Sequence, residues 1–159
     1  MNQTSRNAAL SLRSGDVSDC LICERVARAR EGGDPYVIAE MEHSYFVVGD
    51  HQFHRGYALV LLKEHVREPF ELSSRVQREH FAEVMRAATA LQATFQPWKL
   101  NYSCYGNVEP HVHWHIVPRY EDDPNRGKDP WKDIARFGEH TITAEQALEI
   151  AARVRANFA

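Results

Sequence analysis

Apolar and polar positions along this chain predict five short strands. The strand-like runs are residues 36–40, 45–48, 56–62, 100–105 and 111–117. The run at 56–62, GYALVLL, is almost wholly apolar, which is typical of a strand covered on both faces. Polar residues and a glycine between 50 and 56 indicate a turn that joins two antiparallel strands.

Three other segments have helical periodicity. Apolar residues recur at three- and four-residue spacing over Ser73–Phe95, whose first residue is a plausible N-cap. Shorter helices are predicted at Leu21–Arg30 and Thr143–Asn157, and a Pro/Gly/Asp-rich stretch at 122–133 is predicted to be a loop. The expected fold class is therefore α+β, with an antiparallel sheet of about five strands and a long helix packed on it.

The length of 159 residues and the apolar content of 43% fit one globular domain. We expect residues 1–18, which are mostly polar and small, to form a flexible N-terminal tail. Residues 19–120 would form the main body of the domain. Residues 121–159 would extend the same domain as a loop and a helix.

Charge and composition exclude several classes of function. A net charge of −3 and a pI of about 6.3 argue against binding to duplex nucleic acid. The sequence has no apolar run of membrane-spanning length, and residues 1–18 lack the apolar core of a signal peptide. Three cysteines, an odd number, fit a reducing compartment. We expect a cytoplasmic protein with no membrane partner.

The most informative segment is HVHWHIVPR, residues 111–119. In a strand, alternation places His111, His113 and His115 on one face and the apolar residues between them on the other. Three imidazoles on one face of a buried strand serve to bind a metal, to contact an anion, or to supply a nucleophile and a base. Packing alone does not explain them, because polar residues are rarely buried without a partner or a purpose.

The pattern HVHWHIV resembles the signature of the histidine-triad superfamily. The resemblance runs from Cys20 to Arg119 and includes the opening C-L-I-C and the strand GYALVLLKEH. The stretch GNVEPHVHWHIVPRYEDDP is most similar to bacterial members described as diadenosine-polyphosphate hydrolase-like. The resemblance implies a nucleotide hydrolase or nucleotidyl transferase that acts on a dinucleoside polyphosphate or a nucleoside phosphoramidate. It also implies a homodimer.

The same resemblance assigns catalytic roles. His113 would be the nucleophile that attacks the α-phosphate, with its second ring nitrogen donating to the backbone carbonyl of His111. A neutral imidazole is an unprotonated nucleophile near neutral pH, which supports this role independently. His115 would donate to a phosphate oxygen or to the leaving group, and Asn107 would contact the leaving-group side.

Other positions match substrate-binding residues of the family. Asp50 would bind the ribose hydroxyls and Asn101 the nucleotide, while Arg119 would either contact phosphate or lie solvated at the strand end. Many relatives have a fourth histidine at the position of Tyr57. The Tyr57 hydroxyl would have to replace it, or His54 could stand in, unless His54 is simply a surface turn residue.

A metal site is predicted beside the histidine strand. Cys20 and Cys23 form a C-x-x-C, and together with His65 and His111 they give the ligand set of a Cys2His2 zinc site. Related zinc-bearing proteins use the same combination. Four protein ligands leave no open position, so the zinc would be structural. A redox role for the C-x-x-C is disfavoured because no βαβ pattern accompanies it.

Two other functions are alternatives to nucleotidyl transfer. The three histidines could ligate a catalytic metal in a hydrolase, or the protein could be a nucleotide-binding regulatory module with feeble turnover. Trp131, beyond the resembling region, is expected to shape substrate choice, to pack against a dimer partner, or to pack within the domain.

Overall fold

The computed structural model describes residues 19–159, and the predicted tail at 1–18 lies outside the described residues. A five-stranded antiparallel sheet in the order β1-β2-β3-β5-β4 forms the centre of the molecule. Its strands are β1 Val37–Glu40, β2 Ser44–Val48, β3 Ala58–Leu62, β4 Lys99–Ser103 and β5 His113–Arg119. The predicted α+β class and the number of strands are confirmed.

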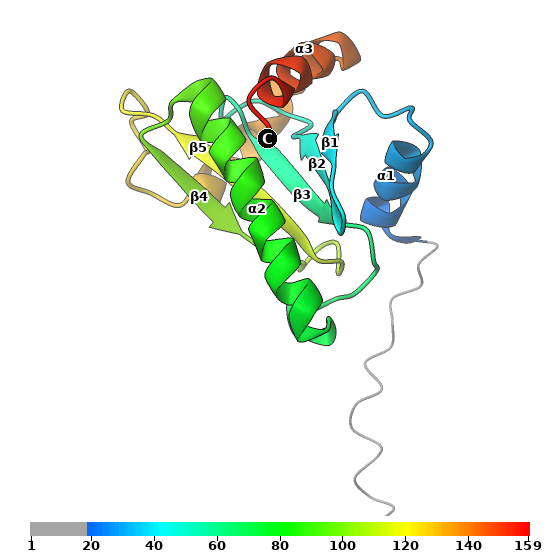
Figure 1. Cartoon of the computed structure of the whole chain (residues 1–159). Helices are drawn as coiled ribbons and strands as arrows, with labels where there is room; N and C mark the ends of the chain where they lie inside the picture. The colour runs from blue at the N-terminus through cyan, green and yellow to red at the C-terminus, as the bar shows by residue number, and fades with distance from the viewer. Residues whose placement is uncertain (1–18) are drawn as a thin grey trace, which may run out of the picture.

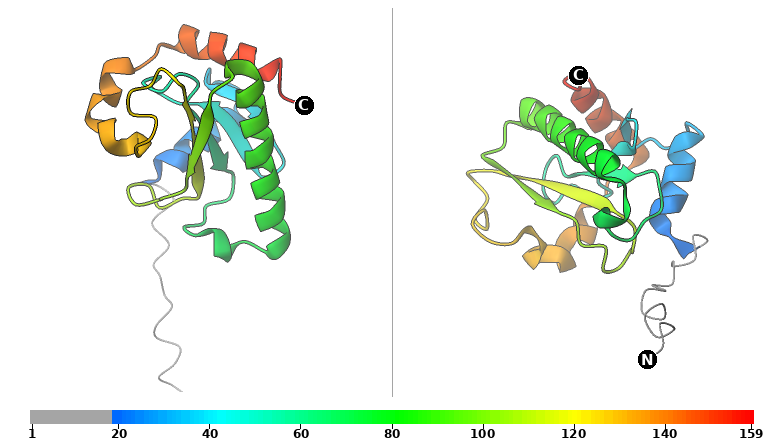
Figure 2. Two further views of the ribbon diagram at one scale, coloured as in Figure 1. Left: turned by 90° about the vertical axis from the view of Figure 1, so that its left-hand side faces the viewer. Right: turned by 60° about the horizontal axis from the view of Figure 1, so that its bottom comes forward.

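Three α-helices and the 3-10 segments η3 and η4 accompany the sheet within residues 19–159. They are α1 Leu21–Arg30, α2 Ser74–Phe95, α3 Ala144–Arg155, η3 Pro69–Glu71 and η4 Pro130–His140. The predicted cap of the long helix is present, because the Ser73 side chain accepts from the backbone N–H of Val76. The Thr143 side chain likewise caps α3 by accepting from the N–H of Gln146. The long helix α2 lies along one face of the sheet (Figure 1), and η4 lies on the opposite side (Figure 2).

Every residue of β2 and β3 is buried, because both faces of the sheet are covered. On one face, Phe46 and Val60 pack in a core with residues of α2 and α3 such as Leu91. On the other face, Tyr45 and Leu61 pack in a second core with residues of α1. The continuous apolar run predicted to be covered on both faces is confirmed in this way.

The segment after β5 keeps its predicted loop over residues 122–129 and differs from the prediction from residue 130 onward. Over Pro130–His140 it forms 3-10 turns, interrupted by non-helical backbone at Asp133. The segment starts with a side-chain cap, since Asp129 accepts from the N–H of Trp131, and with a proline at its first turn. Tertiary packing of Phe137 against the ring of His51 then holds it, which local sequence patterns do not show. No helix within residues 19–159 is long and apolar enough to cross a membrane.

Candidate active site and metal centre

The strand β5 carries two of the three histidines and lies between β3 and β4. His113 pairs with Leu61, and His115 pairs with Leu59 on one side and Ser103 on the other. The intervening Trp114 and Ile116 point into the α2 core, as alternation predicts. His111 lies two residues before the strand begins, so the predicted strand start at 111 is wrong by two residues.

His113 is held by the backbone of its own segment. Its Nδ1 lies 2.6 Å from the carbonyl oxygen of His111. A carbonyl only accepts, so Nδ1 carries the proton and Nε2 keeps its lone pair. The His113 side chain is buried, and it lines a pocket beside the strand. The geometry expected for a nucleophilic imidazole is therefore present.

His115 is oriented by Tyr57. The phenol oxygen of Tyr57 lies 2.7 Å from His115 Nδ1. Burial, with a smaller effect from the nearby His113, lowers the pKa of His115 to about 3, so its ring is neutral. Burial also raises the pKa of the Tyr57 phenol above its ordinary value, so the hydroxyl keeps its hydrogen. A buried hydroxyl needs an acceptor, and Nδ1 provides one; Nε2 of His115 then carries the N–H.

His54, the other possible substitute for a fourth histidine, lies elsewhere. Its Nε2 is 3.2 Å from the carbonyl oxygen of Pro130, and it is 8% exposed. It is therefore neither a triad residue nor the surface residue of the alternative interpretation. Burial lowers its pKa, which keeps it neutral while it donates to that carbonyl and holds the start of η4.

Cys20, Cys23, His65 and His111 come together from α1, the segment after β3 and the segment before β5. Their ligand atoms lie within 4.8 Å of one another. His111 Nδ1 is 3.4 Å from each sulfur and 3.2 Å from His65 Nδ1. Tetrahedral zinc with ordinary bond lengths places its nitrogen and sulfur ligands roughly 3.3–3.8 Å apart.

The protonation pattern of this cluster also fits a metal. His111 Nε2 lies 2.8 Å from the carbonyl oxygen of Leu62, so Nε2 is the protonated nitrogen and Nδ1 is free to ligate. Burial, with help from Cys20, raises the pKa of the Cys23 thiol to about 11. A bound cation would reverse that penalty by favouring the thiolate. The four side chains therefore fit the predicted structural zinc.

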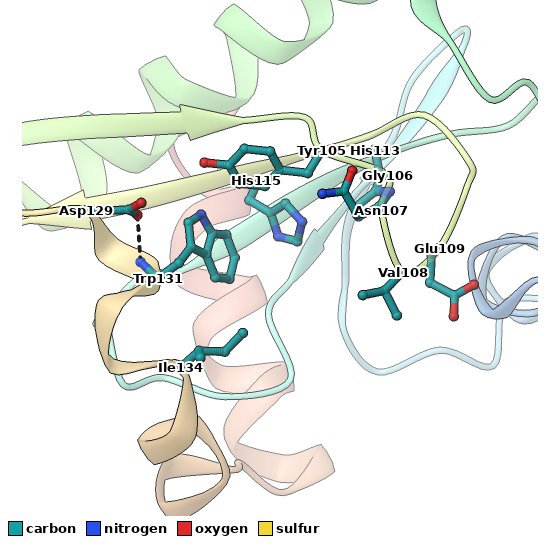
Figure 3. A pocket seen from close by; sticks show the side chains of 10 residues that line it. All are labelled: Tyr105, Gly106, Asn107, Val108, Glu109, His113, His115, Asp129, Trp131 and Ile134. Atoms are coloured by element: carbon teal, nitrogen blue, oxygen red, sulfur yellow. Dashed lines mark hydrogen bonds between the residues drawn. The ribbon is translucent and has the colours of Figure 1, made fainter.

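A pocket of about 510 Å³ opens beside His113 and His115. It is lined by Tyr105, Gly106, Asn107, Val108, Glu109, His113, His115, Asp129, Trp131 and Ile134. Figure 3 shows Trp131 and Ile134 on one side of it and the Asn107–Glu109 loop on the other. Of the residues predicted to contact substrate, Asn107, His113 and His115 line this pocket.

Asp50 does not line this pocket. Its carboxylate is 69% exposed and lies 2.9 Å from the buried guanidinium of Arg25, which also approaches Asp34. The predicted contact of Asp50 with ribose hydroxyls stays a prediction, and it would require a nucleoside that approaches this Arg25 pair. Arg25 was not singled out in the sequence, because an arginine on a predicted surface helix gives no sign that it is buried.

The structure contradicts one of the two roles expected of Arg119, that of a solvated strand-end residue. Its side chain is 1% exposed, so it is not a solvated strand-end residue. The guanidinium donates to the Asp123 carboxylate through Nε and Nη2, to the Asn125 carbonyl through Nη2, and to the Lys128 carbonyl and the Asn101 amide oxygen through Nη1. All five of its N–H donors are thereby used within the protein, and the contact with phosphate stays a prediction. It fastens the segment after β5, and Asn101 is part of that anchor.

The pocket also contains residues that the sequence did not indicate, namely Tyr105, Gly106, Val108, Glu109, Asp129 and Ile134. Tyr105, Val108 and Ile134 are exposed apolar side chains, at 59%, 89% and 60% exposure. Their gathering around two histidines is a tertiary property. The proximity of Tyr105–Glu109 to the triad in the chain was the one available signal.

The orientations of the three histidine rings distinguish a structural metal site from a catalytic one. The ring of His111 is turned toward the cysteines, whereas His113 and His115 do not belong to the metal-ligating cluster. His113 Nδ1 and His115 Nδ1 are each engaged in a hydrogen bond. The three histidines therefore do not converge on one metal, contrary to the catalytic-metal alternative.

Comparisons with known proteins identify the family of this chain. A family model described as the HIT domain matches residues 33–122. The protein named "Protein hit" from Bacillus subtilis is 29% identical over 108 residues, covering 64% of this chain and 72% of its own length. A HIT-like protein from Mycoplasma genitalium, described as uncharacterised, is 31% identical over 118 residues, or 69% of this chain and 79% of its own.

Solved structures show the same fold. A histidine triad protein from Sinorhizobium meliloti superposes with a TM-score of 0.68 at 23% identity, over 89% of this chain and 98% of the other. A zinc-bound histidine triad family protein from Mycobacterium smegmatis has a TM-score of 0.64 at 20% identity, over 89% and 94% of the two chains. With a family model that spans more than half of its length, the chain belongs to the HIT domain family.

Proposed function

We propose that this protein is a nucleotide hydrolase or nucleotidyl transferase that works through a nucleotidyl-His113 intermediate. The observation that carries the proposal is the 2.6 Å hydrogen bond from His113 Nδ1 to the His111 carbonyl. It fixes the tautomer in which Nε2 is a free nucleophile, at the wall of a pocket of about 510 Å³. The fold alone would not carry this conclusion, because one fold hosts many functions.

The reaction proceeds in two displacements. His113 Nε2 forms a bond to the α-phosphorus, and the bond from phosphorus to the leaving group breaks with its electron pair on the leaving atom. His115 donates a hydrogen bond from Nε2–H to a phosphate oxygen or to the leaving atom. Water, or another acceptor, then attacks the same phosphorus. The P–N bond breaks, and its electron pair returns to His113.

The supporting roles follow from the same geometry. Tyr57 holds His115 in the required tautomer. The Asn107 amide lines the pocket on the side where the leaving group is expected. Zinc would be held by Cys20, Cys23, His65 and His111, and it would crosslink α1 to the segment that presents the His111 carbonyl.

A homodimer is part of the proposal. Strand β4 is an edge of the sheet, and the exposed apolar residues Trp98 and Tyr102 lie at or beside it. An open edge with apolar neighbours is suited to pair with a second copy. The three cysteines are unpaired, which is consistent with a reducing cytoplasmic setting.

Intact-protein mass measurement tests the covalent mechanism. The protein is incubated with adenosine phosphoramidate and with a diadenosine polyphosphate, quenched without acid, and weighed. The expected result is a gain of one AMP that is absent in His113→Ala. Cleavage without an adduct would refute the covalent route. Binding without cleavage or adduct would instead favour a regulatory nucleotide-binding module.

A further inference from the structure

The turn after β2 is held by a segment outside the region that matches the HIT domain, which ends at residue 122. Residues 140–142, at the end of η4, pair with residues 50–52 of this turn. His51 and Thr141 form an antiparallel bridge, and two backbone hydrogen bonds of 2.9 and 3.1 Å flank it. A part of the chain that the family model does not cover therefore fixes the backbone around His51.

Four aromatic rings connect this segment to the histidine strand. The His51 ring lies between those of Phe137 and Tyr57, with centroid distances of 4.3 Å and 4.6 Å. It is inclined by 28° to the first and 22° to the second, so the three rings are stacked. The Tyr57 ring is in turn almost parallel to that of His115, at 8°, and its hydroxyl lies 2.7 Å from His115 Nδ1. We name Phe137, His51, Tyr57 and His115 the ring stack.

The Tyr57 ring is confined from several directions. At one edge the backbone of Gly49 comes so close that a Cβ there would lie 2.1 Å from Tyr57 Cδ1. The Tyr57 carbonyl accepts from the Gly49 N–H at 2.9 Å and from the Gln52 side-chain amide at 3.0 Å. The centroid of His51 is nearer to the Tyr57 ring than those of His115 and Trp131, at 6.0 and 6.4 Å. Movement of His51 would therefore change the tilt of the phenol directly.

His51 has an unpaired polar atom that packing alone does not explain. Its Nδ1 is buried and has no hydrogen-bond partner within residues 19–159. Burial, with a smaller effect from His54, lowers the pKa of His51 to about 4, so the ring is neutral. Buried polar atoms without a partner are few in native proteins, because each costs free energy. A flat ring is kept here despite that cost, which indicates that the stack itself is required.

We propose that His51 is a positioning residue for nucleotidyl transfer: backed by Phe137, it holds the Tyr57 phenol where the hydroxyl fixes the tautomer of His115. This inference rests on the proposed function. His51 does not line the pocket beside His113, so its contact with Tyr57 is its route to the reacting atoms. The segment 137–142 then supports the active site of this chain, although it lies outside the family-matched region.

Double-variant kinetics test whether His51 acts through Tyr57. The full chain is assayed with adenosine phosphoramidate. His51→Ala should lower kcat about fivefold and leave KM within about twofold, because the orientation of His115 affects the departing atom more than binding. In a chain that already carries Tyr57→Phe, His51→Ala should cause no further loss, because the hydroxyl that it positions is gone. Losses that multiply in the double variant would overturn the proposal.

Two further variants and a control test the requirement for a ring. His51→Phe keeps a flat ring between Phe137 and Tyr57, and its kcat should stay within about twofold of the wild type. Phe137→Ala removes the backing ring and should lower kcat as His51→Ala does. Val154→Ala is the matched control, because Val154 is buried in the α2 core on the other face of the sheet. It should lower Tm and leave kcat unchanged. A His51→Phe variant as slow as His51→Ala would contradict the role of the ring.

The ¹⁵N shifts of His115 give a readout that does not depend on turnover. His51→Ala should populate the second tautomer of His115, whereas Val154→Ala should not. A nucleotidyl-His113 adduct in the wild type, with kcat and tautomer unchanged in His51→Ala, would overturn this inference alone. Absence of any adduct would overturn the proposed function, and the His115 shifts would still decide whether His51 positions Tyr57.

Discussion

The hydroxyl of Tyr57 is the single group whose removal best tests how the site is built. Tyr57→Phe deletes one oxygen and leaves the rest of a buried ring in place. The ring fits closely because residue 49 is glycine: a Cβ there would lie 2.1 Å from Tyr57 Cδ1. The hydroxyl contacts His115 Nδ1 at 2.7 Å, and the two rings lie almost parallel at 8°.

The stability cost follows from that hydrogen bond. A neutral buried hydrogen bond contributes about 0.5–1.5 kcal/mol, and a buried acceptor left without its donor costs roughly 1–3 kcal/mol. We therefore expect the free energy of unfolding to fall by about 1–2 kcal/mol. For a chain of this size that shift lowers Tm by roughly 2–8 °C. The variant should remain folded.

The catalytic cost follows from the tautomer. Without the phenol, nothing fixes Nδ1 of His115 as the acceptor, so Nε2–H is no longer always presented to the phosphate. We expect kcat/KM for adenosine phosphoramidate to fall about tenfold, which corresponds to about 1.4 kcal/mol of transition-state stabilisation. Tyr57→His, which restores a ring nitrogen able to exchange a hydrogen bond, should recover part of the loss.

Kinetics and nitrogen NMR together give the measurement. The ¹⁵N shifts of His115 report which ring nitrogen is protonated, and they should change in Tyr57→Phe but not in a surface control such as Phe70→Ala. The reasoning is refuted if Tyr57→Phe keeps kcat/KM within twofold of the wild type and leaves the tautomer unchanged. A loss of activity with an unchanged tautomer would also contradict it, because it would point to packing.

Three further predictions follow from the metal cluster, the buried arginine and the neutral histidines. Cys23→Ser should reduce bound zinc from one per chain to near zero by metal analysis and lower Tm; an unchanged metal content would contradict the ligand set. Arg119→Gln should slow nucleotidyl transfer about tenfold or more and increase hydrogen exchange at Lys128 and Trp131, because the segment after β5 loses its anchor; unaltered exchange at these two residues would argue against that role. The pKa of His115 is lowered to about 3 in the folded chain, against about 6.5 when unfolded. Between these values the unfolded chain binds the extra proton, so stability is complete above pH 6.5 and is lost as the pH falls below it, by at most about 1.4 kcal/mol per pH unit. Urea unfolding at pH 7.5 and pH 5 measures this change, and equal midpoints would contradict it.

Much of the fold could be predicted because its signals are local. The alternation in residues 111–117 and the three- and four-residue spacing over Ser73–Phe95 each reflect burial of one face, and burial repeats with the period of the backbone. The cluster of Cys20, Cys23, His65 and His111 could be predicted for a similar reason, since few residue types bind zinc well and the C-x-x-C marks the start of the set. Errors at element ends, such as the start of β5 at His113, are small.

The positions and contacts of polar side chains could not be predicted in the same way. Arg119 was expected either at phosphate or in solvent, and the structure buries it under carbonyl groups of a segment 6–9 residues further along the chain. Likewise, nothing in the order of residues indicates that Trp131 lies on His115 or that Glu109 and Asp129 share one pocket. Such contacts depend on how the chain after β5 folds back, and that path is chosen by long-range packing.

The sequence by itself therefore determined the α+β class, the histidine strand and the Cys/His set that the structure brings together. Each of these depends on residue type and spacing along one segment, or on a small choice of possible ligands. The tertiary structure alone decided that Tyr57 orients His115, that Arg119 is an anchor, and that the pocket is apolar and acidic. Those properties arise from side chains brought together across large sequence separations, where loop closure and packing, and not local periodicity, select the arrangement.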